Sequence, residues 1–158
     1  MKNAILLMLS FFPLACASTP THPRCQSAVS IEYRGIQRLK AWGTEIPFGS
    51  FAVSNKAGKD LTLPLNEAYY PAMVHGPHIE VQSRPLASDT PWELDVVVLE
   101  EFPPSRKWLV IAPGDGAMIF EQMARASSGS ERSRSREYRV VVKDVSGCRY
   151  PSQPFRVD

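Results

Sequence analysis

The sequence has few of the residues from which catalytic and metal sites are usually built. Its 158 residues include only three cysteines and three histidines. It contains no Cys-x-x-Cys pair and no Gly-x-Ser-x-Gly turn, and the run 113–116 (PGDG) lacks the glycine spacing and the lysine of a phosphate-binding loop. Glu100 and Glu101 are adjacent, so on a strand they would point to opposite faces and could not act as a carboxylate pair. We therefore predict a protein that is not an enzyme and binds no cofactor.

Strong charge of one sign and long apolar runs are also absent. The 18 basic and 16 acidic residues leave a net charge of +2, which does not indicate a nucleic-acid partner. No apolar run approaches the roughly 20 residues that a membrane-spanning helix needs. Fourteen prolines disfavour long helices, because proline lacks an amide donor and clashes with the preceding turn.

The N-terminus predicts export. Lys2 precedes the apolar run 4–12, and Pro13 and small residues follow it, which is typical of a secretory signal at 1–17. Cleavage after Ala17 would release a free protein. The alternative is cleavage before Cys16, because residues 14–16 (LAC) also resemble the end of a bacterial lipoprotein signal, in which the cysteine is lipidated. Both cuts remain open, and both predict a periplasmic protein, either soluble or held at the outer membrane by lipid.

Polar residues 18–27 are expected to form an extended tether between the signal and the folded domain. Either cut leaves Cys25 and Cys148 as the two cysteines of the body. Because disulfides persist in exported proteins, we expect these two to pair and to fasten the start of the domain to a late strand.

Apolar and polar residues alternate in short stretches separated by turn-forming residues. The stretches lie at 29–33, 51–53, 61–65, 79–81, 92–98, 107–111, 118–120, 138–142 and 155–157. They predict an all-β fold, a single sandwich of about seven to nine short antiparallel strands over residues 28–158. One stretch differs: residues 35–42 place apolar side chains at three-residue spacing, which predicts one or two helical turns.

The pattern FxVxNxxGKxLxL at residues 51–63 resembles the opening hairpin of bacterial immunoglobulin-like domains, including the BsuPI-like proteinase-inhibitor type. The runs Ile111-x-Pro113-Gly114 and Tyr138-Arg139-Val140 are similar to the closing half of such domains. The resemblance implies an immunoglobulin-like sandwich with a binding or accessory role. It makes an inhibitor of an envelope-directed hydrolase, a protease or a muramidase, the alternative function.

Residues 126–136 (ASSGSERSRSR) are serine-rich and poor in apolar side chains, and they predict a loop between two strands. The loop and its flanks carry the candidate anion- or partner-binding residues Arg125, Arg132, Arg134, Arg136 and Arg139. A solvated loop that its arginines keep soluble is the alternative. The segment contains no aromatic residue on which a nucleic-acid base could stack.

Two further groups are candidate sites. Tyr69, Tyr70 and Met73 could form a patch for a protein or sugar, or could fold over the end of the sandwich. His75 and His78 are close enough in sequence to share a metal, but no third ligand stands beside them, so we expect a solvent-facing turn. A small metal-dependent hydrolase is the alternative that they support. The expected partner is another envelope protein or a cell-wall component, with membrane contact only through a lipid.

Overall fold

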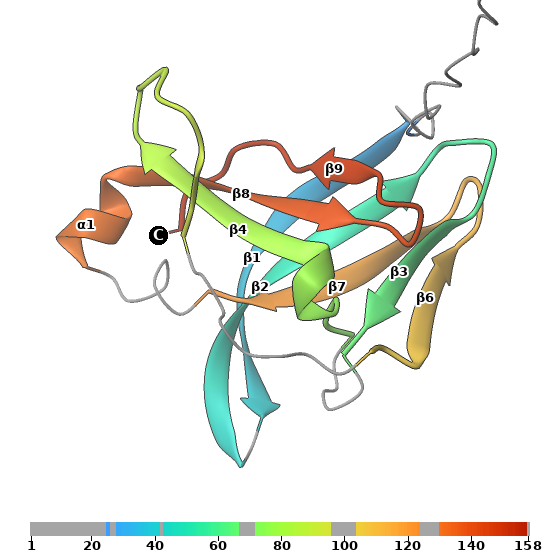
Figure 1. Ribbon diagram of the computed structural model, residues 1–158. Helices are drawn as coiled ribbons and strands as arrows, with labels where there is room; N and C mark the ends of the chain where they lie inside the picture. The colour runs from blue at the N-terminus through green and yellow to red at the C-terminus, as the bar shows by residue number, and fades with distance from the viewer. Residues whose placement is uncertain are drawn as a thin grey trace, which may run out of the picture.

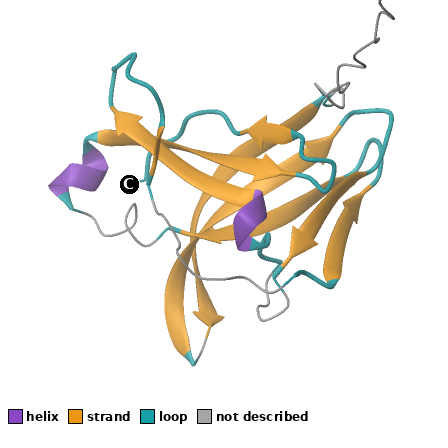
Figure 2. Cartoon of the chain, in the orientation of Figure 1, coloured by secondary structure: helices purple, strands orange, loops and turns teal. Residues whose placement is uncertain are grey.

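The computed structural model describes Cys25 and residues 28–41, 43–66, 72–95, 104–123 and 130–157. Nine strands account for most of these residues (Figures 1 and 2). They are β1 (Val29–Ala41), β2 (Thr44–Asn55), β3 (Leu61–Leu65), β4 (Ile79–Pro85), β5 (Glu93–Leu94), β6 (Lys107–Ile111), β7 (Gly116–Gln122), β8 (Arg136–Lys143) and β9 (Arg149–Pro151). A 3-10 turn, η1 (Gly76–His78), and a four-residue helix, α1 (Glu131–Arg134), complete the described elements.

The strands form three antiparallel sheets, ordered β1-β2-β7, β3-β6 and β5-β4-β8-β9. In Figure 1, β4 and β8 cross in front of β1 and β2. All three sheets contribute to one buried core, for example through Phe51 and Ile119, Leu63 and Ile111, and Val140. The all-β, sandwich-like fold predicted from the alternating pattern is confirmed.

An aromatic cluster closes the core between β1 and β8. The ring of Phe155 stacks on Tyr33 with centroids 4.1 Å apart, and it also contacts Phe51 and Tyr138. Phe155 itself forms an isolated bridge with Tyr138 and not a strand, so the strand predicted at 155–157 is wrong. Pro151 and Pro154 precede Phe155 and lack an amide donor, which limits the pairing that this last segment could form.

The helical turns predicted at 35–42 are also wrong, since β1 continues through Ala41. The register with β2 shifts between Tyr33 and Gly35, which leaves one extra residue in β1. Gly35 adopts a φ of 108°, a conformation that side chains with a Cβ rarely adopt. Beyond this bulge Ile36 and Leu39 lie on opposite faces of the hairpin and are both half-buried, so their spacing only imitates a helix.

Three smaller differences concern the second half of the chain. Residues 131–134 form the helical turn α1 within the segment predicted as a loop. The described part of the strand predicted at 92–98 is β5, which lies at the edge of its sheet. No strand was expected at Arg149–Pro151 from its residues, yet this stretch forms β9 beside β8.

Candidate functional site

The outward face of the β5-β4-β8-β9 sheet carries charged and amide side chains. Residues alternate between the two faces of a strand, and on β4 the inward positions include the buried Val81. The outward positions are Glu80, Gln82 and Arg84 on β4, Glu137 and Arg139 on β8, and Arg149 on β9. Pairing places Gln82 opposite Arg139 and Arg84 opposite Glu137, so the side chains form one continuous polar row.

Two arginines of this row contact the same indole ring. The guanidinium carbon of Arg84 lies 4.4 Å from the ring centroid of Trp92, and that of Arg139 lies 4.5 Å from it. Trp92 immediately precedes β5, whose Leu94 pairs with Gln82, so the indole reaches this row from the edge of the sheet. Contact between a guanidinium and an aromatic face is favourable and holds a long arginine side chain in place.

Hydrogen bonds order the remaining side chains of the row. Arg149 binds the carboxylate of Glu80 through both terminal nitrogens, at 2.9 and 2.7 Å. Gln82 donates to the same carboxylate at 2.8 Å and accepts from Nε of Arg139 at 2.8 Å. Arg84 forms a 2.5 Å ion pair with Glu137.

Arg139 differs from the other two arginines because none of the described residues forms an ion pair with it. Its Nε bonds to a neutral amide, and its terminal nitrogens bond to no carboxylate in the described part of the chain. Burial, followed by the like charges of Arg84 and Arg149, lowers the pKa of Arg139. The positive charges therefore repel one another at this point, and an anion placed there would relieve that repulsion.

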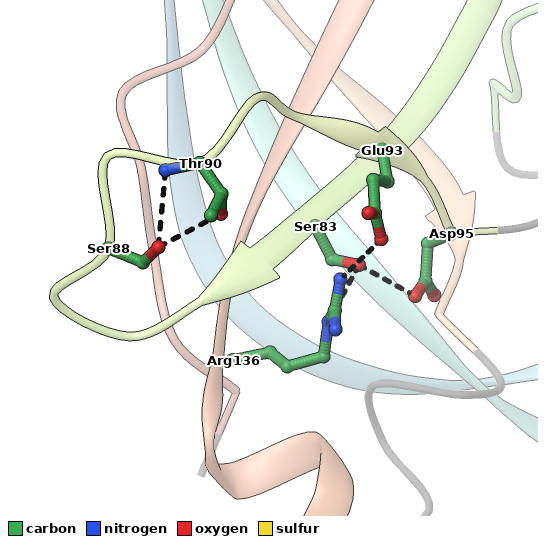
Figure 3. A network of polar contacts seen from close by, with 6 residues as sticks. All are labelled: Ser83, Ser88, Thr90, Glu93, Asp95 and Arg136. Carbon is green, nitrogen blue, oxygen red and sulfur yellow. Dashed lines mark hydrogen bonds and ion pairs between the residues drawn. The ribbon is translucent and has the colours of Figure 1, made fainter.

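A second polar network lies on the other side of β4 (Figure 3). The hydroxyl of the buried Ser83 donates to a carboxylate oxygen of Asp95 at 3.0 Å, and it accepts from Nε of Arg136 at 3.0 Å. Arg136 also reaches Glu93, at 3.3 Å. Figure 3 shows Arg136 extended beneath Ser83 and Glu93, and Ser88 and Thr90 joined separately in the adjoining loop.

This network joins the end of β4 to β5 and the start of β8, and it does not form a hydrolase triad. An activated serine needs a base that accepts its proton near neutral pH, which a histidine usually supplies. Ser83 is buried and bonds directly to a carboxylate and a guanidinium, so its hydroxyl is engaged on both sides. The arrangement orders the sheet edge that presents Trp92.

The five arginines predicted as one basic loop do not act together in the part of the chain that can be described. Arg139 belongs to the β8 row, whereas Arg136 is engaged in the Ser83 network. Arg134 is exposed at the end of α1. Arg125 and the side chain of Arg132 lie outside the described residues. The prediction of a single loop is corrected, because alternation along β8 sends Arg136 and Arg139 to opposite faces.

His75 precedes η1 and His78 is its last residue, and their ring centroids lie 6.2 Å apart. His75 is buried, and Nδ1 of His78 lies 3.0 Å from the carbonyl oxygen of Lys143. The prediction that both face solvent is therefore wrong for His75. Within the described ranges no group of three or more histidine, cysteine, aspartate or glutamate side chains could hold a metal ion.

Met73, the third member of the patch predicted to bind a protein or sugar, is buried and bridges to Phe120 of β7. Its side chain therefore lies inside the fold and cannot serve as a surface contact. Tyr69 and Tyr70 lie outside the described residues, as do the predicted signal at 1–17, Cys16 and all of the predicted tether except Cys25.

Cys25 and Cys148 are joined by a disulfide, with Cα atoms 5.2 Å apart. A buried carboxylate positions the second cysteine: Asp144 accepts hydrogen bonds from the amide of Cys148 at 2.9 Å and from the hydroxyl of Tyr150 at 2.9 Å. It also accepts from the amide and hydroxyl of Ser146. The bond fastens Cys25, which precedes β1 in the chain, to the β8–β9 turn, as predicted.

Glu121 of β7 is a carboxyl group that the sequence analysis did not single out. It pairs with Gly49 of β2 and is half-buried. Burial raises the pKa of its carboxyl to about 8, and a hydrogen bond from the backbone of Gln122 opposes this only in part. Among the described residues no charged group contributes to the shift, so burial is its main cause.

Comparison with known proteins gives no match to a family model, to a curated protein or to a solved structure. Among the described residues no helix has the length and apolar character to cross a bilayer. The candidate site therefore stands on its geometry alone.

Sequence reasoning identified Arg139 but missed its neighbours Arg84, Trp92 and Arg149. The available signal was the alternation itself, since Glu80, Gln82 and Arg84 occupy every second position of a short strand. A pattern of this kind indicates a polar outward face. The alternation does not indicate which strands lie beside β4.

Proposed function

We propose that this chain is an exported envelope protein with a non-catalytic binding role, and that it binds through the outward face of β4 and β8. Its ligand is a carboxylate-bearing component, either an acidic envelope protein or a cell-wall polymer. The single observation that carries the proposal is that Arg139 is held against Trp92 and leaves its terminal nitrogens without an anionic partner among the described side chains.

The neighbouring contacts support a carboxylate as the recognised group. Arg149 already holds Glu80 through two parallel hydrogen bonds, and Arg84 holds Glu137. The planar fork of a guanidinium matches a carboxylate in this way, and such bonds are stronger than those between neutral groups. A carboxylate of the ligand would pair with Arg139 in the same way that Glu80 pairs with Arg149 and Glu137 pairs with Arg84.

The test is a titration with galacturonate oligomers as a polysaccharide probe and with poly-glutamate as a protein-like probe, followed by tryptophan fluorescence. Arg139→Gln is the informative variant, because it breaks no ion pair among the described residues. We expect it to weaken binding by about tenfold, since one charge-assisted interaction of roughly 1.5 kcal/mol is lost.

Arg34→Gln is the matched control. Arg34 lies on β1 and pairs with Glu32 at 2.8 Å, so its replacement removes the same charge at an exposed position on another sheet. We expect this control to bind within about twofold of the unaltered protein at moderate salt. Equal losses in the two variants would show that only the overall charge matters, and the absence of binding to both probes would refute the proposal.

A further inference from the structure

Strand β6 (Lys107–Ile111) lies at the margin of the fold. Within the described ranges it pairs with β3 alone. Figure 1 shows β3 on one side of β6 and no other labelled strand on the other. An edge strand with free backbone groups is a template on which another strand can pair.

The contacts of β3 identify which backbone groups of β6 are free. The carbonyl of Pro64 accepts a hydrogen bond from the amide of His75, and that of Thr62 accepts one from the amide of Val145. Both carbonyls therefore point away from β6. In an antiparallel pair, hydrogen-bonded and non-hydrogen-bonded positions alternate, so the residues opposite them belong to non-hydrogen-bonded pairs.

Those opposite residues are Val110, which faces Thr62, and Trp108, which faces Pro64. Their amide and carbonyl groups consequently point to the free edge of β6. Their side chains share the outward face and are 55% and 53% exposed, whereas Leu109 between them points inward and is half-buried. Free backbone groups and exposed apolar side chains thus occur on the same two residues.

We propose that two copies of this chain associate through β6, in antiparallel register with Leu109 opposite Leu109 of the second copy. Trp108 then faces Val110 of the second copy, and each of these two pairs exchanges two backbone hydrogen bonds. All five residues of β6 are paired, and β3 and β6 of both copies form one continuous sheet. This inference does not depend on the proposed binding face.

A second copy fits this edge because the register is self-complementary. Trp108 opposite Val110 is an aromatic–β-branched pair, one of the favourable cross-strand combinations. Lys107 lies opposite Ile111, so the two lysines stand at opposite ends, about 14 Å apart along the strands and beyond the screening length at physiological salt. Shifting the register by two residues in either direction leaves residues of β6 without a partner.

The test is sedimentation velocity of the purified chain over a range of concentrations up to about 1 mM. We expect the unaltered protein to shift from monomer to dimer across this range. Val110→Lys should raise the dissociation constant at least tenfold, because it places two charges in the interface. Leu94→Lys is the matched control, since Leu94 is equally exposed (52%) but lies on β5, and it should change the constant less than twofold.

Val110→Pro tests the backbone directly. Proline removes the amide that points to the free edge and no amide that bonds to β3, so the fold should persist while dimerisation is lost. Circular dichroism checks the fold, and Val110→Lys decides the outcome if the proline variant unfolds. The proposal is overturned if the unaltered chain stays monomeric to about 1 mM, or if Val110→Lys self-associates as strongly as Leu94→Lys.

Discussion

Replacing Cys25 and Cys148 together by serine is expected to lower the free energy of unfolding by roughly 4–5 kcal/mol. The disulfide closes a span of 123 residues, almost the whole folded domain. In the chain-entropy view the bond stabilises by restricting the unfolded chain, and the effect grows with the length of the loop. A loss of this size is a large part of the stability of an ordinary domain.

Urea unfolding of the oxidised protein and of the double serine variant measures the difference. The unaltered protein in its reduced form is the control, because it keeps both cysteines and lacks only the bond, and its midpoint should match that of the double serine variant. Alkylation under non-reducing conditions should leave Cys25 and Cys148 unlabelled. Labelling of both cysteines would contradict the disulfide. Equal stability of the double variant and the unaltered protein would contradict its expected effect on stability.

The stability of the protein is expected to fall as the pH rises from about 4.5 to about 8, and Glu121 is the cause. Burial raises the pKa of this carboxyl from 4.5 to about 8, so the folded state keeps a proton that the unfolded state releases in that interval. The state that binds more protons is favoured at low pH. Above pH 8 the accumulated cost to folding is at most about 4–5 kcal/mol for a shift of this size.

Glu121→Gln removes the titrating group while retaining its shape. We expect the variant to unfold at the same urea concentration as the unaltered protein near pH 4 and at a clearly higher concentration at pH 8.5. Glu45→Gln serves as the control, because it makes the same substitution at an exposed residue of β2 and so measures the effect of the substitution itself. If the urea midpoints of Glu121→Gln and the unaltered protein change with pH in the same way, Glu121 is not the cause of the pH dependence.

Much of the fold was predictable from the sequence because the alternation of a strand is a local signal. Leu61, Leu63 and Leu65 alternate without interruption, and β3 has the bounds expected. The disulfide was predictable for another reason: once Cys16 is set aside, only one pairing of cysteines remains. Both predictions rest on information within one segment or on simple counting.

The failures occur where the structure depends on what lies beside a segment. Ile36 and Leu39 are three residues apart in an extended strand and so lie on opposite faces, but their spacing alone does not show that this segment pairs with β2. The contact of Arg84 and Arg139 with Trp92 requires the register of β4 with both β5 and β8. Pairing between strands distant in sequence follows from the whole core, so the candidate site could not be assembled from local patterns.

The binding face on β4 and β8 is the central claim, and resonance mapping tests it most directly. Galacturonate oligomers are titrated into isotope-labelled protein while the Nε resonances of the arginines and the indole resonances of the tryptophans are followed. We predict that the signals of Arg139, Arg84 and Trp92 shift first and together, while those of Arg34 and Trp108 remain in place. Shifts confined to Arg34, Trp108 or other positions away from β4 and β8 would contradict the account.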